Sequence, residues 1–336
     1  MSRPGGQVLR YGIFQPGRAG DFVLTTGLFN ALREECPGCH LTVVVGPRSR
    51  ELARAHPAID RVVVLDQSPV HLAAMLAALL RHRFAAWIDP KPHPSRNSVI
   101  AARLVRADRR IGWNGSSRVF DLALPAPADP PVHYARQALA PLPLLGLPLP
   151  PEPRLSLGLT APAAEWARQE RAGAEFTVLV NVSAGSGSRY WPYRSWRELL
   201  PRLARLRSTR FLLNAAPADR TAAVELAAAA AGQGADVRLL PQTDLLHVAA
   251  AVAAADAVLT VDTSIVHIAA AFDIPVLALF LRVEPVFTAY QPLSRVREVV
   301  AAPAGEPMAA VPVAEVEAAW QRLLGALAPV PGGSGR

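Results

Sequence analysis

Cysteine and lysine are the two residue types that this chain of 336 residues almost lacks. Its two cysteines, Cys36 and Cys39, form one C-x-x-C pair, and no second pair follows to complete a zinc site or a disulfide framework. We therefore expect them to be two small residues at a turn between a helix and a strand. Lys91 is the only lysine among 35 basic residues.

Long apolar runs are also absent from the sequence. No window reaches the ~18 uninterrupted apolar residues of a membrane-spanning helix, since Asp256 interrupts the nearest candidate, VAAAVAAADAVL. The N-terminal MSRPGGQVLRYGIF lacks the basic start and long apolar core of a secretory signal. We expect a cytoplasmic protein that can touch the cytoplasmic face of an inner membrane.

Three familiar signatures of nucleotide and metal sites are missing. The sequence has no G-x-G-x-x-G, no G-x-x-x-x-G-K-[ST], and no D-x-D pair to hold a metal–diphosphate complex. These absences disfavour the common dinucleotide-binding and P-loop enzymes. We predict no metal site and no cofactor.

The basic charge is unevenly spread along the chain. Residues 1–160 contain 19 Arg and Lys against 11 Asp and Glu, and residues 161–336 contain 16 of each, so the net charge of +8 comes from the first part. Such asymmetry indicates that the first part meets an anionic partner. We do not expect a nucleic acid, because the basic part has no evident strand surface with interleaved aromatic residues.

Short apolar runs alternate with amphipathic segments along most of the chain. Runs rich in valine and isoleucine predict parallel strands, and the segments between them predict crossover helices. The first expected strands are QVLRYGIF, HLTVVVG, RVVVL and AAWIDP, and the helices between and after them are DFVLTTGLFNALREE, SRELARAH, HLAAMLAALLRHR and NSVIAARLVRA. The first half of the chain therefore reads as a doubly wound α/β domain.

A proline-rich stretch separates this pattern from a second one. Residues 123–162 carry many prolines, which neither helix interiors nor central strands tolerate. Alternation resumes at FTVLVNV and ends with a helix at VAEVEAAWQRLLGAL. We predict two Rossmann-like doubly wound domains, residues 1–155 and 156–336, facing each other across a cleft at the carboxyl edges of their sheets.

Polar residues follow a predicted strand in VLTVDTSIVHIAAAF. Asp262, Thr263 and Ser264 stand where the strand ends and a helix begins, and His267 follows. The unpaired N–H groups of a helix's first turn hold phosphate well, which suits Thr263 and Ser264 to a diphosphate. Asp262 would repel a diphosphate, and it fits a helix cap or a sugar hydroxyl better. Ordinary helix capping is the alternative for the whole turn.

A second turn, NVSAGSGSRYWPYRSW, follows another predicted strand. Its small residues, Ser186 among them, let backbone N–H groups approach an anion, and Arg189 can clamp phosphate oxygens with two N–H groups. A flexible turn with a surface arginine is the alternative.

A third turn, FQPGRAGDFVLTTG, ends the first predicted strand. Gly17 and Gly20 permit a tight turn, and Asp21 opens the next helix. A carboxylate that faces the cleft from the opposite domain would suit a general base. A simple N-cap is the alternative for Asp21.

Together these turns resemble glycosyltransferase family 9, the ADP-heptose:lipopolysaccharide heptosyltransferases. The segments GDFVLTTG, NVSAGSGSRYWP and DTSIVHIAA are similar to three motifs of the family, in the same order. The resemblance implies a GT-B architecture and an inverting, metal-independent transfer of heptose from ADP-heptose to the lipopolysaccharide inner core. It implies a nucleotide-sugar donor in the C-terminal domain and an anionic lipid-linked oligosaccharide acceptor in the N-terminal domain.

The resemblance also implies roles for individual residues. Asp21 matches the catalytic base, and Arg189 stands where the family has a phosphate-binding lysine. The other donor-binding positions are Ser186, Asp219, Thr243, Asp262, Thr263, Ser264 and His267. The acceptor-binding candidates of the basic first half are Arg18, Arg48, Lys91 and Arg96.

Two alternatives stay open from the sequence. One is a family member that uses another nucleotide sugar, or a protein or capsular glycan as acceptor. The other binds a nucleotide without transfer, because Asn181, Ser183 and Ser264 differ from the motif residues. Intact Asp21 and His267 count against this loss of activity.

Overall fold

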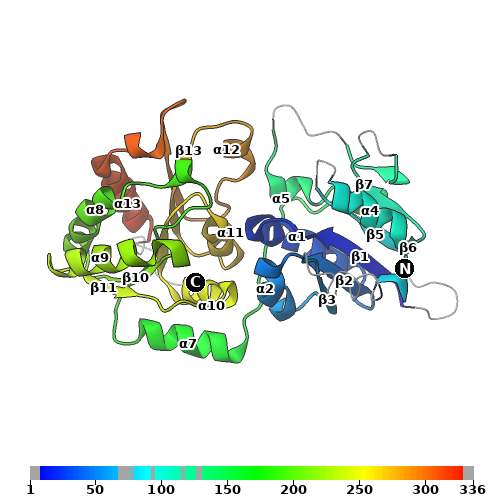
Figure 1. Cartoon of the computed structure of the whole chain (residues 1–336), viewed down its shortest axis with the longest axis horizontal. Helices are drawn as coiled ribbons and strands as arrows, with labels where there is room; N and C mark the ends of the chain where they lie inside the picture. Colours follow the sequence, from blue (N-terminus) through cyan, green and yellow to red (C-terminus); the bar gives the residue numbers. More distant parts are fainter. Residues whose placement is uncertain are drawn as a thin grey trace, which may run out of the picture. The chain divides into compact units, whose positions relative to one another are not determined.

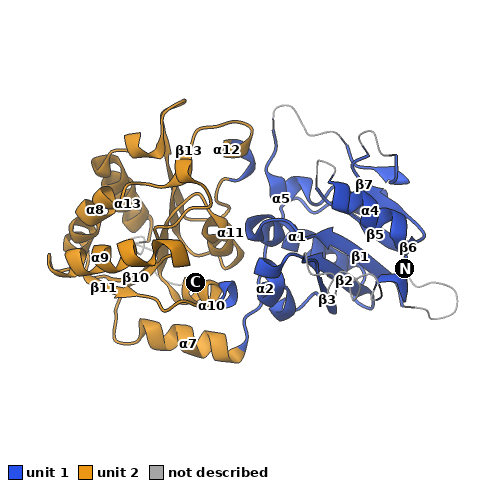
Figure 2. Cartoon of the chain, viewed as in Figure 1, with its two compact units in different colours: residues 1–160, 244–246, 288–290 blue, residues 161–243, 247–287, 291–336 orange. Residues whose placement is uncertain are grey.

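The protein forms two compact α/β units, coloured separately in Figure 2. This computed structural model describes residues 8–66, 77, 79–91, 95–114, 118–125 and 131–327. Unit 1 comprises residues 1–160, 244–246 and 288–290, and unit 2 comprises residues 161–243, 247–287 and 291–336. The first unit thus extends to Thr160, past the boundary at 155 expected from the sequence, and takes in two short segments from later in the chain.

Unit 1 is built on a six-stranded parallel sheet in the order β3-β2-β1-β5-β7-β8 (Figure 1). Its strands are β1 (Arg10–Gln15), β2 (His40–Val45), β3 (Arg61–Val64), β5 (Ala86–Ile88), β7 (Arg110–Gly112) and β8 (Leu122–Ala123). Its helices include α1 (Ala19–Glu35), η1 (Pro47–Ser49), α2 (Arg50–Ala55), α4 (Arg96–Leu104), α5 (Tyr134–Gln137) and α6 (Pro141–Leu144). Strands β4 (Arg83–Phe84) and β6 (Arg106–Ala107) pair separately. The helix predicted in HLAAMLAALLRHR lies largely outside the described residues.

Aromatic side chains fill the core beside strands β1 and β5. Phe14, Phe84 and Trp87 are fully or almost fully buried there, with α4 packed against them through Ala101. Trp87 lies across β1 at Gly12, where a Cβ would stand only 2.4 Å from the indole Cε3. Any larger residue at position 12 would displace the indole from the strand.

The proline-rich stretch is a packed part of unit 1 rather than a bare connection. It contains β8, α5 and α6, and the side chains of Tyr134 and Leu142 are buried. Pro141 stands in the first turn of α6, where a missing N–H group leaves no helix hydrogen bond unmade. The described residues of this stretch up to Thr160 therefore belong to unit 1.

Unit 2 repeats the architecture with a parallel sheet in the order β11-β10-β9-β12-β13-β14. Its strands are β9 (Thr177–Asn181), β10 (Arg210–Asn214), β11 (Asp236–Leu239), β12 (Ala257–Val261), β13 (Val276–Leu281) and β14 (Arg297–Ala302). Its helices include α7 (Ala161–Arg171), η2 (Gly187–Arg189), α8 (Tyr193–Leu206), η3 (Pro217–Asp219), α9 (Arg220–Ala231), α11 (Ser264–Ala271), η4 (Met308–Ala310) and α13 (Val313–Leu327). Helices α10 (Leu245–Ala254) and α12 (Val286–Ala289) contribute residues to both units.

The core of unit 2 lies between the sheet and helices α8, α9 and α13. Trp191 and Trp196 meet edge to face there, with ring centroids 4.9 Å apart. Trp191 Nε1 also donates to the carbonyl oxygen of Val311 at 3.0 Å. This packing anchors the end of the loop that carries Arg189, since Trp191 follows it by two residues.

Each sheet has one place where its strand order reverses. In unit 1 it lies between β1 and β5, and in unit 2 it lies between β9 and β12. Loops leave such a pair of strands toward opposite sides of the sheet, so their carboxyl ends open a crevice for ligands. All three turns singled out in the sequence follow one of these four strands.

Candidate functional site

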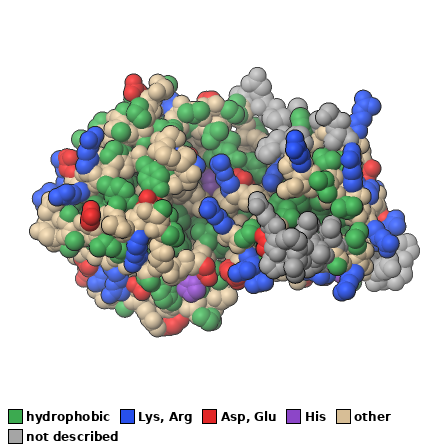
Figure 3. All heavy atoms as spheres, in the orientation of Figure 1, with side chains coloured by type: hydrophobic (Ala, Val, Ile, Leu, Met, Phe, Trp, Pro, Cys, Tyr) green, Lys and Arg blue, Asp and Glu red, His purple; other side chains and the backbone are tan. Residues whose placement is uncertain are grey.

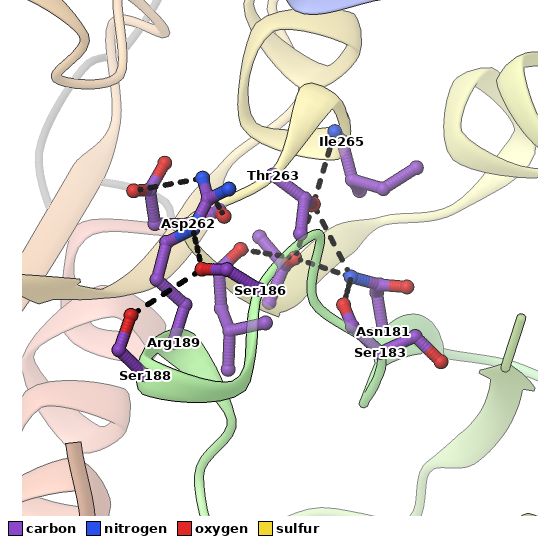
Figure 4. Close-up of polar contacts among 10 residues, drawn as sticks. Asn181, Ser183, Ser186, Ser188, Arg189, Asp262, Thr263 and Ile265 are labelled. Atoms are coloured by element: carbon purple, nitrogen blue, oxygen red, sulfur yellow. Dashed lines mark hydrogen bonds and ion pairs between the residues drawn. The ribbon is translucent and has the colours of Figure 1, made fainter. Parts of the chain in front are cut away.

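Asn181 connects the two strand ends at the reversal point of unit 2 (Figure 4). Its Nδ2 donates to the carbonyl oxygen of Ser183 at 3.0 Å, to Thr260 Oγ1 at 3.1 Å and to Thr263 Oγ1 at 3.2 Å. Asn214 Nδ2 donates to Asn181 Oδ1 at 2.9 Å. Because both ends of its amide are engaged, Asn181 shapes the site, a role that the sequence did not predict.

Thr263 caps helix α11, so Asp262 does not fill the capping role that the sequence left open for it. Thr263 Oγ1 accepts a hydrogen bond from the N–H of Ile265 at 3.3 Å. Ser264 begins the helix, and His267 is buried further along it. The carboxylate of Asp262 instead lies beside a basic side chain.

This basic side chain belongs to Arg189, which reaches across from η2 (Figure 4). Arg189 Nη1 donates to the Asp262 carbonyl oxygen at 3.1 Å and lies 3.3 Å from the carboxylate oxygen Oδ2. Arg189 Nε donates to Ser186 Oγ at 3.1 Å. Only 21% of the Arg189 side chain and 12% of the Asp262 side chain are exposed, so the two charges offset each other in a shielded place.

The pairing of Asp262 with Arg189 explains how this turn can bind a phosphate although it carries a carboxylate. The guanidinium offsets the charge that would repel an anion, and it has five N–H donors in all. The N–H groups at the start of α11 add donors and partial positive charge beside it. The site is thus suited to a diphosphate that competes with Asp262 for part of the guanidinium.

Asp219 is joined to the same loop through Tyr190. The Tyr190 hydroxyl donates to Asp219 Oδ2 at 2.8 Å, and burial together with this carboxylate raises the pKa of Tyr190. The structure therefore brings together Ser186, Arg189, Asp262 and Thr263 and connects Asp219 to them. Thr243 is exposed on a different loop, between β11 and α10.

Asp21 lies in the first turn of α1, at the reversal point of unit 1. Its side chain is half-buried, and the α1 N-cap position is Arg18, so Asp21 is not the capping residue. Burial raises the pKa of the Asp21 carboxyl above its ordinary value. The charges of Lys91 and Arg18 and hydrogen bonds from the Arg18 backbone and Tyr290 act in the opposite direction.

Four side chains near Asp21 were not singled out by sequence analysis: Gln15, Thr25 and Tyr134, which are buried, and the half-buried Tyr290. Gln15 Nε2 donates to the Asp21 carbonyl oxygen at 3.3 Å, to Thr25 Oγ1 at 2.7 Å and to the Tyr134 hydroxyl at 3.2 Å. Tyr134 stacks on Tyr290, with ring centroids 5.6 Å apart. No local pattern could have indicated Tyr290, because it is far from Asp21 in the sequence.

The four acceptor-binding candidates fall into two groups. Arg18, Arg48 and Arg96 are exposed on unit 1. Lys91 differs, since only 8% of the residue is exposed. Figure 3 shows Lys and Arg side chains scattered over the visible face of unit 1 rather than gathered in one patch.

Metal and membrane features were searched within the described part of the chain. No group of three or more His, Cys, Asp and Glu side chains there could hold a metal ion. Cys36 and Cys39 are buried and form no disulfide. No helix among these residues combines the length and the apolar character needed to cross a membrane.

Comparison with known proteins identifies the family of this chain. The model of glycosyltransferase family 9 (heptosyltransferase) matches residues 91–316, more than half of the chain. A search of curated proteins found no match.

Several solved structures share the fold. A family 9 glycosyl transferase from Veillonella parvula DSM 2008 is 17% identical, with 94% of this chain and 97% of that chain covered and a TM-score of 0.80. E. coli heptosyltransferase WaaC with ADP is 22% identical, with 94% and 100% covered and a TM-score of 0.75. E. coli ADP-heptose LPS heptosyltransferase II is 19% identical, with 95% and 100% covered and a TM-score of 0.79. These similarities confirm the predicted GT-B architecture of two Rossmann-like domains.

Proposed function

Because the chain belongs to glycosyltransferase family 9 and is a glycosyltransferase, we propose that it transfers a heptose from ADP-heptose to the lipopolysaccharide inner core. The single observation that supports this proposal is the pair of charged groups at the two points where the strand order of a sheet reverses. One offers a shielded guanidinium beside a helix N-terminus, and the other offers a half-buried carboxylate of raised pKa. These are the parts needed to stabilise a departing diphosphate and to deprotonate an attacking hydroxyl.

Unit 2 is proposed to bind the donor. Arg189, Ser186 and the first N–H groups of α11 would hold the diphosphate, with Thr263 and Ser264 at that helix start. Asp219 would accept hydrogen bonds from donor hydroxyls, and Thr243 would lie near the base. Similar structures that contain ADP and ADP-2-deoxy-2-fluoro heptose support a donor of this class.

Unit 1 is proposed to bind the acceptor and to supply the base. Asp21 would take the proton of an acceptor hydroxyl while its oxygen attacks the anomeric carbon and ADP departs with the bonding electrons. A half-buried carboxylate of raised pKa is a stronger base than an exposed one. Attack opposite the leaving group inverts the anomeric centre, and no step requires a metal ion.

An anionic, lipid-linked oligosaccharide is the acceptor that we propose. Arg18, Arg48 and Arg96 are exposed on the unit that carries the excess of positive charge. Attraction of an anionic ligand by such a surface speeds its encounter with the protein. Because a lipid-linked acceptor is held at a bilayer, we place the protein in the cytoplasm, in peripheral contact with the inner membrane.

Release of ADP tests this function directly. The purified, EDTA-treated protein is mixed with ADP-heptose in the presence and absence of extracted inner-core lipid, and ADP and the mass of the lipid are measured. We expect acceptor-dependent ADP release and a lipid heavier by one heptose. Transfer to a protein or capsular glycan only, or from another nucleotide sugar only, would replace this proposal with the corresponding family alternative.

Two further outcomes of the same experiment are informative. Nucleotide binding without release of ADP on any acceptor would indicate a member without transfer activity. Activity that returns only after a divalent or iron salt is added would contradict the metal-independent mechanism, and a related glycosyltransferase, TibC, is iron-containing.

A further inference from the structure

Lys91 differs from the other basic residues of this chain in its residue type and in its position. It is the only lysine among 35 basic residues, and all the others are arginine. It is buried, and it follows strand β5 at the reversal point of unit 1. A chain that uses arginine at every other basic position therefore uses a compact ammonium at one enclosed position, and these two cations are not interchangeable.

The Lys91 ammonium faces the Asp21 carboxylate across the open side of Gly17. A Cβ placed on Gly17 would stand 3.1 Å from Asp21 Oδ2, 3.2 Å from Gln15 Oε1 and 3.2 Å from Lys91 Nζ. Three polar atoms from different elements thus converge on the space that glycine leaves empty. The planar guanidinium of an arginine at position 91 would be larger than the lysine ammonium that borders this space.

Hydrogen bonds fix the backbone at Lys91 and the orientation of the Gln15 amide. Asp89 holds the turn before the lysine, since its Oδ1 accepts from the Lys91 N–H at 3.2 Å and its Oδ2 accepts from the Ser98 hydroxyl. The Gln15 amide is oriented by its three Nε2 contacts, which turn Oε1 toward Gly17. Gln15 Oε1 is fully buried and has no hydrogen-bond partner among the described residues. The space beside Gly17 therefore has an acceptor and a cation ready for a hydroxyl-bearing ligand.

We propose that Lys91 is a positioning residue for the base, which keeps Asp21 ionised and directed at the acceptor hydroxyl. The inference rests on the proposed function, in which the hydroxyl proton passes to Asp21. In that step the new C–O bond forms at the anomeric carbon, and the bond to ADP breaks.

Several groups other than Lys91 act on the Asp21 carboxylate. Arg18 is a second cation, on the N-terminal side of α1, and it is exposed, so solvent weakens its effect. Among the described residues, the phenols of Tyr134 and Tyr290 and the buried Asp89 are further titratable or charged groups of this cluster. Lys91 is the foremost influence that opposes the effect of burial on the pKa of Asp21.

Replacement of Lys91 by methionine tests this role with two measurements. The first is the titration of the Asp21 carboxyl by ¹³C NMR in the absence of substrates, with its signal identified by loss in Asp21→Asn. The second is the pH profile of kcat. In Lys91→Met we expect the pKa of Asp21 to rise and kcat to fall by at least ~10-fold at pH 6, with a smaller loss at pH 8.

Two variants keep the result interpretable. Lys91→Arg should restore the carboxyl titration more fully than kcat, because it returns the charge but not the compact geometry. Arg54→Met, which removes an exposed positive charge from α2 of the same unit, should change neither measurement. Melting temperatures of all variants report folding, and Lys91→Gln replaces Lys91→Met if the latter is unfolded.

The outcomes separate this inference from the function on which it rests. An unchanged Asp21 titration in folded Lys91→Met, or a kcat lowered equally at every pH, would overturn the role of Lys91. A shifted titration in a protein that transfers no heptose would leave the coupling intact and contradict the proposed function instead.

Discussion

The two reversal points each place a carboxylate shortly after a strand end, in opposite electrostatic settings. In unit 2, Asp262 has the Arg189 guanidinium 3.3 Å from its Oδ2, and the pair is shielded from solvent. In unit 1, the effect of burial on Asp21 outweighs that of its cations, so its pKa rises. The same α/β framework thus holds a compensated carboxylate in one unit and an under-compensated one in the other.

This difference corresponds to two kinds of chemistry. The cation beside a compensated carboxylate can receive an anion. An under-compensated carboxylate is a better base, because protonation relieves the cost of its burial. We therefore expect changes at Asp21 to affect turnover, and changes at Arg189 to affect nucleotide binding.

The largest effect is expected from Asp21→Asn. Asparagine keeps the shape of the side chain but does not take up the acceptor proton, so kcat should fall by at least ~10²-fold with ADP affinity almost unchanged. Single-turnover transfer and calorimetric titration with ADP measure the two quantities. A variant that transfers heptose at nearly the wild-type rate would show that the base lies elsewhere.

The same variant makes an opposite prediction for stability. A pKa raised in the folded state means that the stability due to Asp21 is present at low pH and lost as pH rises through the folded pKa. Asp21→Asn removes the ionisable carboxyl and with it this loss of stability. The melting temperature of the variant at pH 7 should therefore equal or exceed that of the wild type. At pH 3 the two proteins should differ less. A lower melting temperature at pH 7 only would indicate that the ionised carboxylate stabilises the fold.

The sequence predicted the frame of both sites but not their internal pairing. The alternation of apolar runs indicated the strands, and parallel strands bring the turns after them to one edge of each sheet. The sequence left open whether Asp262 caps α11, because capping depends on backbone angles. In the structure, Thr263 has the extended backbone and the hydrogen bond of the capping residue. The sequence grouped Lys91 with the acceptor-binding arginines and did not indicate its burial, because burial at position 91 depends on how β1, β5 and α1 pack together.

Arg189→Ala should have the next largest effect. Loss of charge-assisted hydrogen bonds and exposure of the Asp262 charge should weaken ADP binding by at least ~10-fold. Arg189→Lys should recover part of this affinity. Arg197→Ala on α8 is a matched control, since its side chain is exposed and should leave ADP affinity unchanged. Equal ADP affinity of Arg189→Ala and the wild type would remove Arg189 from the donor site.

A double variant tests the pairing in unit 2. If Arg189 offsets the charge of Asp262, then Arg189→Ala with Asp262→Asn should bind ADP more tightly than Arg189→Ala alone. The difference measures a coupling between two residues in contact. Additive losses in the two single variants would mean that the ion pair has no part in nucleotide binding.

A smaller effect is expected from salt. Exposed charges are screened over ~8–10 Å near physiological ionic strength, so binding of the anionic acceptor to unit 1 should weaken several-fold as salt rises. Donor binding should weaken less, because the Arg189 side chain is only 21% exposed. Affinities for both ligands across a salt series test this, and equal sensitivity would contradict separate roles for the two units.

The smallest effect concerns a second buried titratable group of unit 1. His56 is 2% exposed, and burial lowers its pKa from 6.5 to about 4. Its Nδ1 accepts from the Ala58 N–H at 3.2 Å, its Nε2 lies 3.4 Å from Ser156 Oγ, and its ring meets Phe29 edge to face. The neutral imidazole is therefore part of the core, where the effect of burial on its pKa outweighs the opposing hydrogen bond with Ser156.

The sign of its pH dependence follows from the lowered pKa. The unfolded chain binds a proton near pH 6.5, and the folded protein resists it until about pH 4, so stability present above pH 6.5 is lost as pH falls through this window. The loss is on the order of 3 kcal/mol at most. His56→Asn, whose Oδ1 can accept from the Ala58 N–H, should lower the free energy of unfolding at pH 7 and flatten its decline toward pH 4. Urea unfolding of both proteins at pH 7 and 4.5 measures this. An equal decline in wild type and variant would place the acid sensitivity of unit 1 in groups other than His56.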